Sequence, residues 1–142
     1  MKKNAEAQVF RLWKAYQDIK IHTASAKSLI SATGFIISAC NPRSQLCEQS
    51  FNRRKTQKLQ RYLESNHIEF KLLLVGDVTF SWSEPSFLIF ATESQARNLA
   101  RIYQQNAVYQ LKQGELWLVP VLLGQVTPTS MGPVSTFISG NS

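Results

Sequence analysis

The chain has 142 residues, of which 44% are apolar and 18% charged, and this composition is that of one globular domain rather than of a disordered or fibrous protein. Its longest apolar runs are far shorter than the roughly 20 residues that a transmembrane helix needs, and no secretory apolar segment follows Lys2 and Lys3. We therefore expect a cytoplasmic protein without a membrane segment.

The net charge of +7 is concentrated in one part of the chain. Residues 43–61 hold six of the 16 basic residues and a single acid, Glu48, whereas residues 62–142 hold more acidic than basic side chains. A local positive field favours an anionic partner for that surface, and an ordinary solvated helix face explains it equally well. The charge alone does not separate these two interpretations.

The two cysteines do not indicate a metal site or a disulfide. Cys40 and Cys47 match no zinc or redox spacing, and the only two histidines, His22 and His67, do not cluster with them. We expect two free thiols, no structural metal and no cofactor.

Hydrophobic periodicity and turn residues divide the chain into alternating helices and strands. The surest helix begins at Thr92, which forms a capping box with Gln95. In chain order the elements are a helix at 4–18, a short strand at 19–23, a helix or loop at 24–33, strands at 35–40 and 68–75 on either side of a helix at 48–65, a polar connection at 78–85, a strand at 87–91, a helix at 93–105 and a hairpin of 107–111 with 115–119.

This order predicts an α/β or α+β fold with a single mixed sheet of at least four strands, covered by helices and ending in an antiparallel hairpin. Helical connections favour parallel neighbours, and Pro120 is expected to place the last strand at a sheet edge or a bulge. Residues 1–123 would form the domain. Residues 124–142 contain no charged side chain and are rich in Thr, Ser, Gly and Pro, which predicts a flexible tail.

The loop after the strand at 35–40 is the first candidate site. Asn41, Pro42, Arg43 and Ser44 lie where a buried strand gives way to a helix, which in α/β sheets is the usual place for ligands. Arg43 and backbone N–H groups there could hold a phosphate or carboxylate. Asn-Pro is also a common turn starter, and no phosphate-binding glycine pattern is present.

Glu84 is the candidate catalytic residue. It precedes an apolar strand and has Trp82 two residues upstream, so burial could raise its pKa as an acid–base group requires. A solvent-facing loop carboxylate is the alternative interpretation. Asn106 ends a helix, where an asparagine often serves only as a cap.

The helix at 48–65 carries a basic stripe beside its apolar face. Clustered basic side chains are what contacts to a nucleic-acid backbone need, although no known nucleic-acid-binding motif accompanies them. Asn52 points into the apolar sector of the same helix and needs a buried partner. The stripe consists of Arg53, Arg54, Lys58 and Arg61.

Several segments together resemble a small bacterial family, the domain of unknown function 3293, over nearly the whole chain up to about Val119. The segments that carry the resemblance are Leu12-Trp13-x-x-Tyr16, the run at 37–44, Asn52, the run at 82–89 and the run at 103–108. The chain departs from the family in Cys40, in Gln104 where glycine is usual, and in a shortened segment after Tyr16. The resemblance implies no activity, but it groups one polar set: Asn41, Ser44, Asn52, Glu84, Ser86, Gln105 and Asn106.

We therefore expect these side chains to converge in a pocket for a small anionic, nucleotide-like ligand, with Arg43 pairing to the anion and Glu84 acting as acid or base. The alternative is a nucleic-acid or protein interaction module that uses the basic stripe without catalysis. A third hypothesis is a purely structural network of buried hydrogen bonds. The sequence predicts no oligomeric state.

Overall fold

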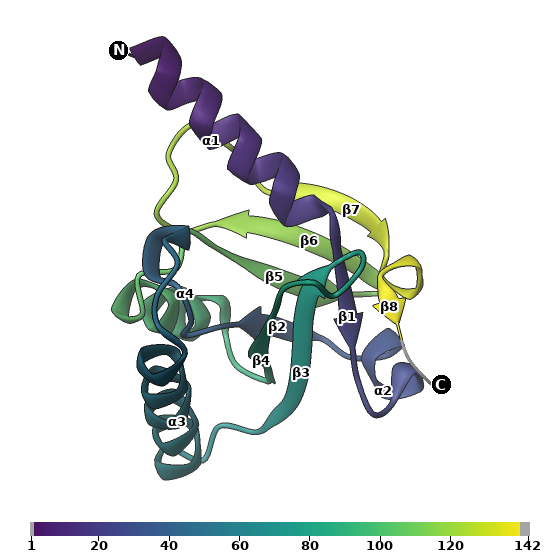
Figure 1. Cartoon of the computed structure of the whole chain (residues 1–142). Helices are drawn as coiled ribbons and strands as arrows, with labels where there is room; N and C mark the ends of the chain where they lie inside the picture. Colours follow the sequence, from purple (N-terminus) through teal and green to yellow (C-terminus); the bar gives the residue numbers. More distant parts are fainter. Residues whose placement is uncertain (1, 140–142) are drawn as a thin grey trace.

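The computed structural model describes residues 2–139, and these residues form one curled sheet with two of the four helices on its outer face (Figure 1). No helix within this range is both long and apolar enough to cross a bilayer. The elements are α1 (Lys2–Gln17), β1 (Ile19–His22), α2 (Ala26–Ile30), β2 (Gly34–Ile37), the 3-10 turn η1 (Pro42–Ser44), α3 (Gln49–Ser65), β3 (Phe70–Asp77), β4 (Ser83–Ile89), α4 (Glu93–Ile102), β5 (Ala107–Lys112), β6 (Glu115–Pro120), β7 (Thr129–Pro133), the 3-10 turn η2 (Val134–Thr136) and β8 (Ile138–Ser139).

The sheet has the strand order β7-β6-β5-β2-β4-β3-β1-β8, and β2, which is buried along its whole length, is a central strand. The sheet is mixed, which confirms the fold class, but its one parallel pair is β1 with β8. Helical connections do not join parallel neighbours here. α3 links β2 to β3 across β4, and α4 links β4 to β5 across β2.

The segment from β2 to β5 therefore has the βαββαβ order of a ferredoxin-like unit, in which each helix connects strands that run the same way with another strand between them. The inserted strand explains why the expectation of parallel neighbours was wrong. Both helices cover one face of this unit. Leu59 and Leu63 of α3 and Leu99 of α4 pack there with Phe35, Phe87 and other strand residues.

The sheet curls because its two edges are joined by a short connection. A flat sheet of this size would place β7 about 34 Å from β8. Only residues 134–137 lie between these strands, and such a segment reaches at most about 18 Å. The inner face of the curl encloses a second apolar core that includes Ile21, Leu29 and the fully buried Val134.

The predicted flexible tail is wrong for the described residues. After Gly124 the chain forms β7, which pairs with β6, and β8, which pairs with β1. The sheet therefore continues past β6, and Pro120 ends an internal strand rather than an edge strand. Composition did not reveal this segment, because backbone pairing and a few scattered apolar side chains hold it in place: Val134 is fully buried, and Met131, Phe137 and Ile138 pack against the same core.

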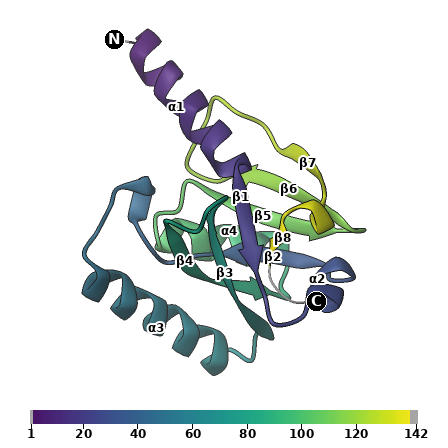
Figure 2. The same ribbon diagram turned by 45° about the vertical axis from the view of Figure 1, so that its right-hand side comes forward.

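Helix α1 projects from the body of the molecule in both views (Figures 1 and 2). Four apolar and aromatic residues recur at helical spacing in α1, and of these Trp13 is buried, while Val9, Leu12 and Tyr16 are partly exposed. The indole Nε1 of Trp13 donates to Thr129 over 3.2 Å, which ties the last turns of α1 to β7. The C-terminal end of α1 thereby lies at the open end of the curled sheet.

Candidate functional site

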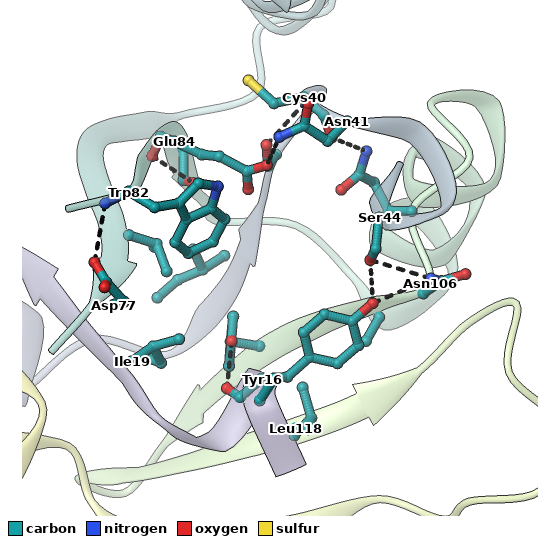
Figure 3. A pocket seen from close by; sticks show the side chains of 18 of the residues that line it. Tyr16, Ile19, Cys40, Asn41, Ser44, Asp77, Trp82, Glu84, Asn106 and Leu118 are labelled. Carbon is teal, nitrogen blue, oxygen red and sulfur yellow. Dashed lines mark hydrogen bonds between the residues drawn. The ribbon is translucent and has the colours of Figure 1, made fainter. Parts of the chain in front are cut away.

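A cavity of about 480 Å³ opens at the end of the inner face of the sheet, next to the C-terminal end of α1 (Figure 3). Successive side chains of a strand point to opposite faces, so every second residue lines the inner face. Along β4 these residues are Leu88, Ser86 and Glu84, and they change from apolar core to polar cavity wall. The same change occurs from Ile36 to Ser38 in and just after β2.

Glu84 lies on the wall of this cavity within β4, opposite Val75 of β3, and not in the preceding loop. Burial raises the pKa of its carboxyl to about 7, and hydrogen bonds from Asn41 and Ser38 oppose this increase only in part. The alternative of a solvent-facing carboxylate is therefore wrong. Glu84 is a group that exchanges its proton near neutral pH.

Asn41 holds the loop that covers Glu84. Its side-chain oxygen accepts from the backbone N–H of Cys47 and from Nδ2 of Asn52, both over 2.9 Å, and its Nδ2 donates to Glu84 over 2.8 Å. Its backbone N–H in turn donates to Oδ1 of Asn52 over 2.9 Å. Asn52, which the sequence places in the apolar sector of α3, thus has Asn41 as its hydrogen-bond partner.

The same loop has an unusual backbone. Asn41, Arg43 and Ser44 all adopt left-handed conformations, with φ of 47°, 55° and 61°. Asparagine tolerates this region, whereas Arg and Ser are strained there, and such strain persists only where surrounding contacts impose it. One of these contacts is the 2.7 Å hydrogen bond from the Arg43 N–H to the carbonyl of Gln104, which itself has a φ of 53°. Gln104 therefore makes the tight turn that glycine would make more readily.

A second cluster closes the opposite side of the cavity. The hydroxyl groups of Tyr16 and Ser44 are hydrogen-bonded, and Nδ2 of Asn106 donates to both, over 3.0 Å and 3.2 Å. The hydroxyl of Tyr109 donates to the Tyr16 carbonyl. These contacts join α1, the η1 loop and the start of β5, three segments that are distant in sequence (Figure 3).

Trp82 forms part of the rim, and the turn between β3 and β4 holds it. Asp77 accepts from the Trp82 backbone N–H over 3.0 Å and from the hydroxyls of Thr79 and Ser81. These bonds, led by that from Ser81, lower the pKa of Asp77. Gly76 permits the close approach, because a Cβ there would lie 2.4 Å from the Trp82 carbonyl oxygen.

A smaller cavity of about 370 Å³ adjoins the first. Its wall includes the first turns of α3, with Arg53 and Thr56, as well as Cys47. The two cavities share five lining residues: Cys40, Asn41, Leu46, Trp82 and Glu84. Burial raises the pKa of the Cys40 thiol.

The structure brings most of the expected polar set together. Six of its seven members line the larger cavity: Asn41, Ser44, Glu84, Ser86, Gln105 and Asn106. Asn52 lines the smaller one. Gln105 donates to the Cys40 carbonyl over 3.0 Å, and Ser86 donates to the Glu84 carbonyl, so both have structural partners.

Arg43 lies elsewhere. It lines neither cavity, and its Nε donates to the side chain of Gln104. The residues that line the larger cavity include Asp18, Asp77 and Glu84 but no Lys, Arg or His. The expectation that Arg43 pairs with an anion in this cavity therefore has no support in the geometry.

Sequence reasoning did not assign three aromatic residues to the site, namely Tyr16, Trp82 and Tyr109. Tyr16 and Trp82 belong to the segments that carried the family resemblance, and that was the available signal. Tyr109 had no such signal in the sequence, because an aromatic residue in a strand ordinarily belongs to the hydrophobic core. No group of three or more His, Cys, Asp or Glu side chains within residues 2–139 is arranged to hold a metal ion.

The four residues of the basic stripe are all exposed on α3, whose buried side presents Leu59 and Leu63. They differ in position, since Arg53 lines the smaller cavity and Arg54, Lys58 and Arg61 do not. Among the side chains of residues 5–139, which the structure describes, the one ion pair joins Arg97 to Glu93. The four basic groups of the stripe therefore have no acidic partner in that part of the chain.

Comparison with known proteins gives a family without an assigned activity. Neither a curated protein nor a solved structure matches the chain. A family model described as a protein of unknown function, DUF3293, matches residues 37–108, which is just over half of the chain. The match begins at the last residue of β2, contains α3, β3, β4 and α4, and ends in the first residues of β5. Both η1 and Glu84 lie inside this match, and the chain belongs to the DUF3293 family.

Proposed function

We propose that the protein binds a small molecule with a planar, amino-bearing heterocycle, of the kind found in adenosine and cytidine, in the 480 Å³ cavity. The observation that carries the proposal is Glu84, a largely buried carboxyl on the cavity wall with a pKa of about 7. The volume lies within the range of about 300–1,000 Å³ that is typical of small-molecule sites.

The chemistry of the carboxyl favours this class of ligand. A protonated carboxyl presents a donor and an acceptor side by side. The edge of adenine or cytosine presents the complementary pair, a ring nitrogen that accepts and an amino group that donates. A carboxyl that is half protonated near pH 7 supplies this arrangement at little cost, and Asn41 holds it in place over 2.8 Å.

The aromatic lining and the charge of the cavity support the same class. Tyr16, Trp82 and Tyr109 give the wall flat apolar surfaces, and stacking of a base on such a ring contributes about 1–3 kcal/mol. The lining has carboxylates and no basic side chain, so it favours a neutral or cationic ring over an anion. Because Glu84 exchanges its proton near neutrality, it is also the proposed acid–base group for a reaction of the bound molecule.

The test is calorimetry with two pairs of nucleosides that differ only in an amino or a carbonyl group, cytidine against uridine and adenosine against inosine. We expect a member with an amino group to bind at least tenfold more tightly than its partner. Glu84→Leu should abolish binding, whereas Glu84→Gln should retain it, since an amide also presents an acceptor and a donor. The exposed Glu64→Gln is the matched control and should change nothing.

Two results would overturn the proposal. The first is equal affinity, or no affinity, for both members of both nucleoside pairs. The second is unchanged binding by a folded Glu84→Leu protein, because the carboxyl would then make no contact with the ligand.

A second candidate function rests on the basic stripe of α3, which is exposed and forms no ion pair with the side chains of residues 5–139. We propose nucleic-acid backbone binding by Arg54, Lys58 and Arg61, for which clustered positive charge is the requirement. Replacing all three with glutamine should remove salt-dependent binding to single- or double-stranded DNA or RNA. No binding by the unmodified protein at low salt would exclude this candidate.

A further inference from the structure

We infer that the smaller cavity takes the phosphate of a nucleotide whose base occupies the larger cavity, with Arg53 as the anion-binding residue. This inference rests on the proposed function and extends it from a heterocycle to a nucleoside monophosphate. Three observations support it: the continuity of the two cavities, the difference in their charge, and the position of Arg53 relative to its neighbours on α3.

The cavities are two compartments of one cleft. Asn41, Trp82 and Glu84 line both, so a ring that contacts Glu84 in the larger compartment lies directly beside the smaller one. Trp82 is 39% exposed and stands on the shared rim, and Leu46, 84% exposed, also borders both. The smaller compartment therefore offers further volume to a ligand that is longer than the ring in the larger one.

The two compartments differ in charge. The larger one has the three carboxyl groups of Asp18, Asp77 and Glu84 and no basic group in its lining. The lining of the smaller one contains Arg53 and a single acid, Glu84, which is neutral whenever it is protonated to pair with a heterocycle. A ligand that is neutral at one end and anionic at the other matches both compartments, and a nucleotide is such a molecule.

Arg53 is distinguished from the rest of the basic stripe by its place on the cavity wall. It shares that wall with the amide side chains of Gln49, Asn52 and Gln57, whose N–H groups are further donors for phosphate oxygens. The guanidinium group forms paired hydrogen bonds with phosphate, which a lysine at the same place would not reproduce. Arg54, the next residue of α3, lines neither compartment.

The experiment compares each nucleoside with its 5′-monophosphate, in the wild type and in two matched variants, Arg53→Gln and Arg54→Gln. We expect the phosphate to increase the affinity of the wild type about tenfold or more, as a charge-assisted pair of hydrogen bonds would. Arg53→Gln should remove this gain and leave nucleoside affinity unchanged. Arg54→Gln should keep the gain.

Cys47 provides a readout that reports the position of the phosphate. It lines the smaller compartment only and is partly exposed, so its alkylation by iodoacetamide can be followed by mass spectrometry. We expect cytidine or adenosine monophosphate to slow the labelling of Cys47 at least fivefold in the wild type and not in Arg53→Gln. The corresponding nucleosides should slow it little.

The outcomes separate the two proposals. If no nucleoside binds, the proposed function fails and this inference fails with it. If nucleosides bind and the phosphate adds no affinity, or if Arg53→Gln and Arg54→Gln lose equal amounts, only the inference about the smaller compartment is overturned. Unchanged labelling of Cys47 by a tightly bound nucleotide would also overturn it.

Discussion

Asn41 donates a hydrogen bond to Glu84 over 2.8 Å, although 43 positions separate the two residues in the chain. The amide of Asn41 is oriented by Cys47 and Asn52, which both donate to its oxygen and leave its nitrogen facing Glu84. One side chain therefore couples the η1 loop, the start of α3 and strand β4. A change at Asn41 should therefore affect both the pKa of Glu84 and the conformation of the loop that covers it.

Asn41→Asp should raise the pKa of Glu84 above 7. The substitution removes the Nδ2 donor that favours the charged carboxylate and adds a second negative charge beside it, and both effects act in the same direction. Aspartate tolerates the left-handed backbone at this position, so the loop is expected to persist. NMR titration of the Glu84 carboxyl carbon measures the shift, which we expect to be about one unit or more.

The control is Asn66→Asp at the C-terminal end of α3, where the exposed side chain donates a hydrogen bond to the Tyr62 carbonyl and lines neither cavity. It should leave the titration of Glu84 unchanged. A Glu84 pKa that stays the same or falls in Asn41→Asp would contradict the coupling described above.

Glu84→Gln should have a higher free energy of unfolding than the wild type at pH 8, but not at pH 4. The folded-state pKa of about 7 lies above the ordinary value of 4.5, so the unfolded chain loses this proton first as pH rises. Stability conferred by the neutral carboxyl is complete below pH 4.5 and is lost as pH rises through 7. The difference of about 2.5 pKa units corresponds to at most about 3 kcal/mol.

Denaturant unfolding of the wild type and Glu84→Gln between pH 4 and pH 8 measures this difference. The two curves of unfolding free energy against pH should diverge as pH increases. Parallel curves would mean that Glu84 titrates at its ordinary value, and the chemical basis of the proposed ligand pairing would then be lost.

The elements of the fold were largely predictable because their signals are local. The capping box of Thr92 with Gln95 is present at the start of α4, and the hairpin of β5 and β6 forms around Gln113 and Gly114. Pairing between strands is not local. The insertion of β4 between β2 and β3, and the addition of β7 and β8 at the two edges, depend on contacts that no periodicity reports.

The sequence predicted which residues belong to the candidate site, but not how their side chains are arranged in it. Asn41, Glu84 and Asn106 were grouped by a family resemblance, and the structure brings all three to one cavity. The direction of the Arg43 side chain was not predictable, because it follows from a left-handed backbone that only the tertiary contacts of the loop impose. The expectation that Arg43 pairs with an anion in the larger cavity therefore has no support in this geometry, and Arg53 on α3, which lines the smaller cavity, was not part of the expected pocket.

Gly76→Ala should displace Trp82 and weaken ligand binding. A Cβ at this position would lie 2.4 Å from the Trp82 carbonyl oxygen and 2.8 Å from the Phe80 ring. The carbonyl belongs to the backbone, so relieving this contact requires the main chain at Trp82 to shift. We expect a loss of about 2 kcal/mol in the free energy of unfolding. The fluorescence of Trp82, separated from the other tryptophans with a Trp13→Phe and Trp117→Phe background, reports its displacement.

Gly124→Ala is the matched control, because nothing lies within 4 Å of a Cβ at that position. It should change stability by no more than about 0.5 kcal/mol. Equal stability losses in the two alanine variants would show that the approach of Trp82 to Gly76 does not constrain the rim of the cavity.

Val134→Ala tests whether the C-terminal segment is part of the domain. Val134 is fully buried in the core on the inner face of the sheet, between the two strands that form its edges. Removing two methyl groups from such a site should cost about 2 kcal/mol of unfolding free energy. Val78→Ala, at a position that is 61% exposed, is the matched control and should cost less than about 0.5 kcal/mol. Thermal and denaturant unfolding measure both, and a Val134→Ala protein as stable as its control would mean that β7 and β8 do not close the curled sheet, so that the cavity is bounded by a sheet with open edges.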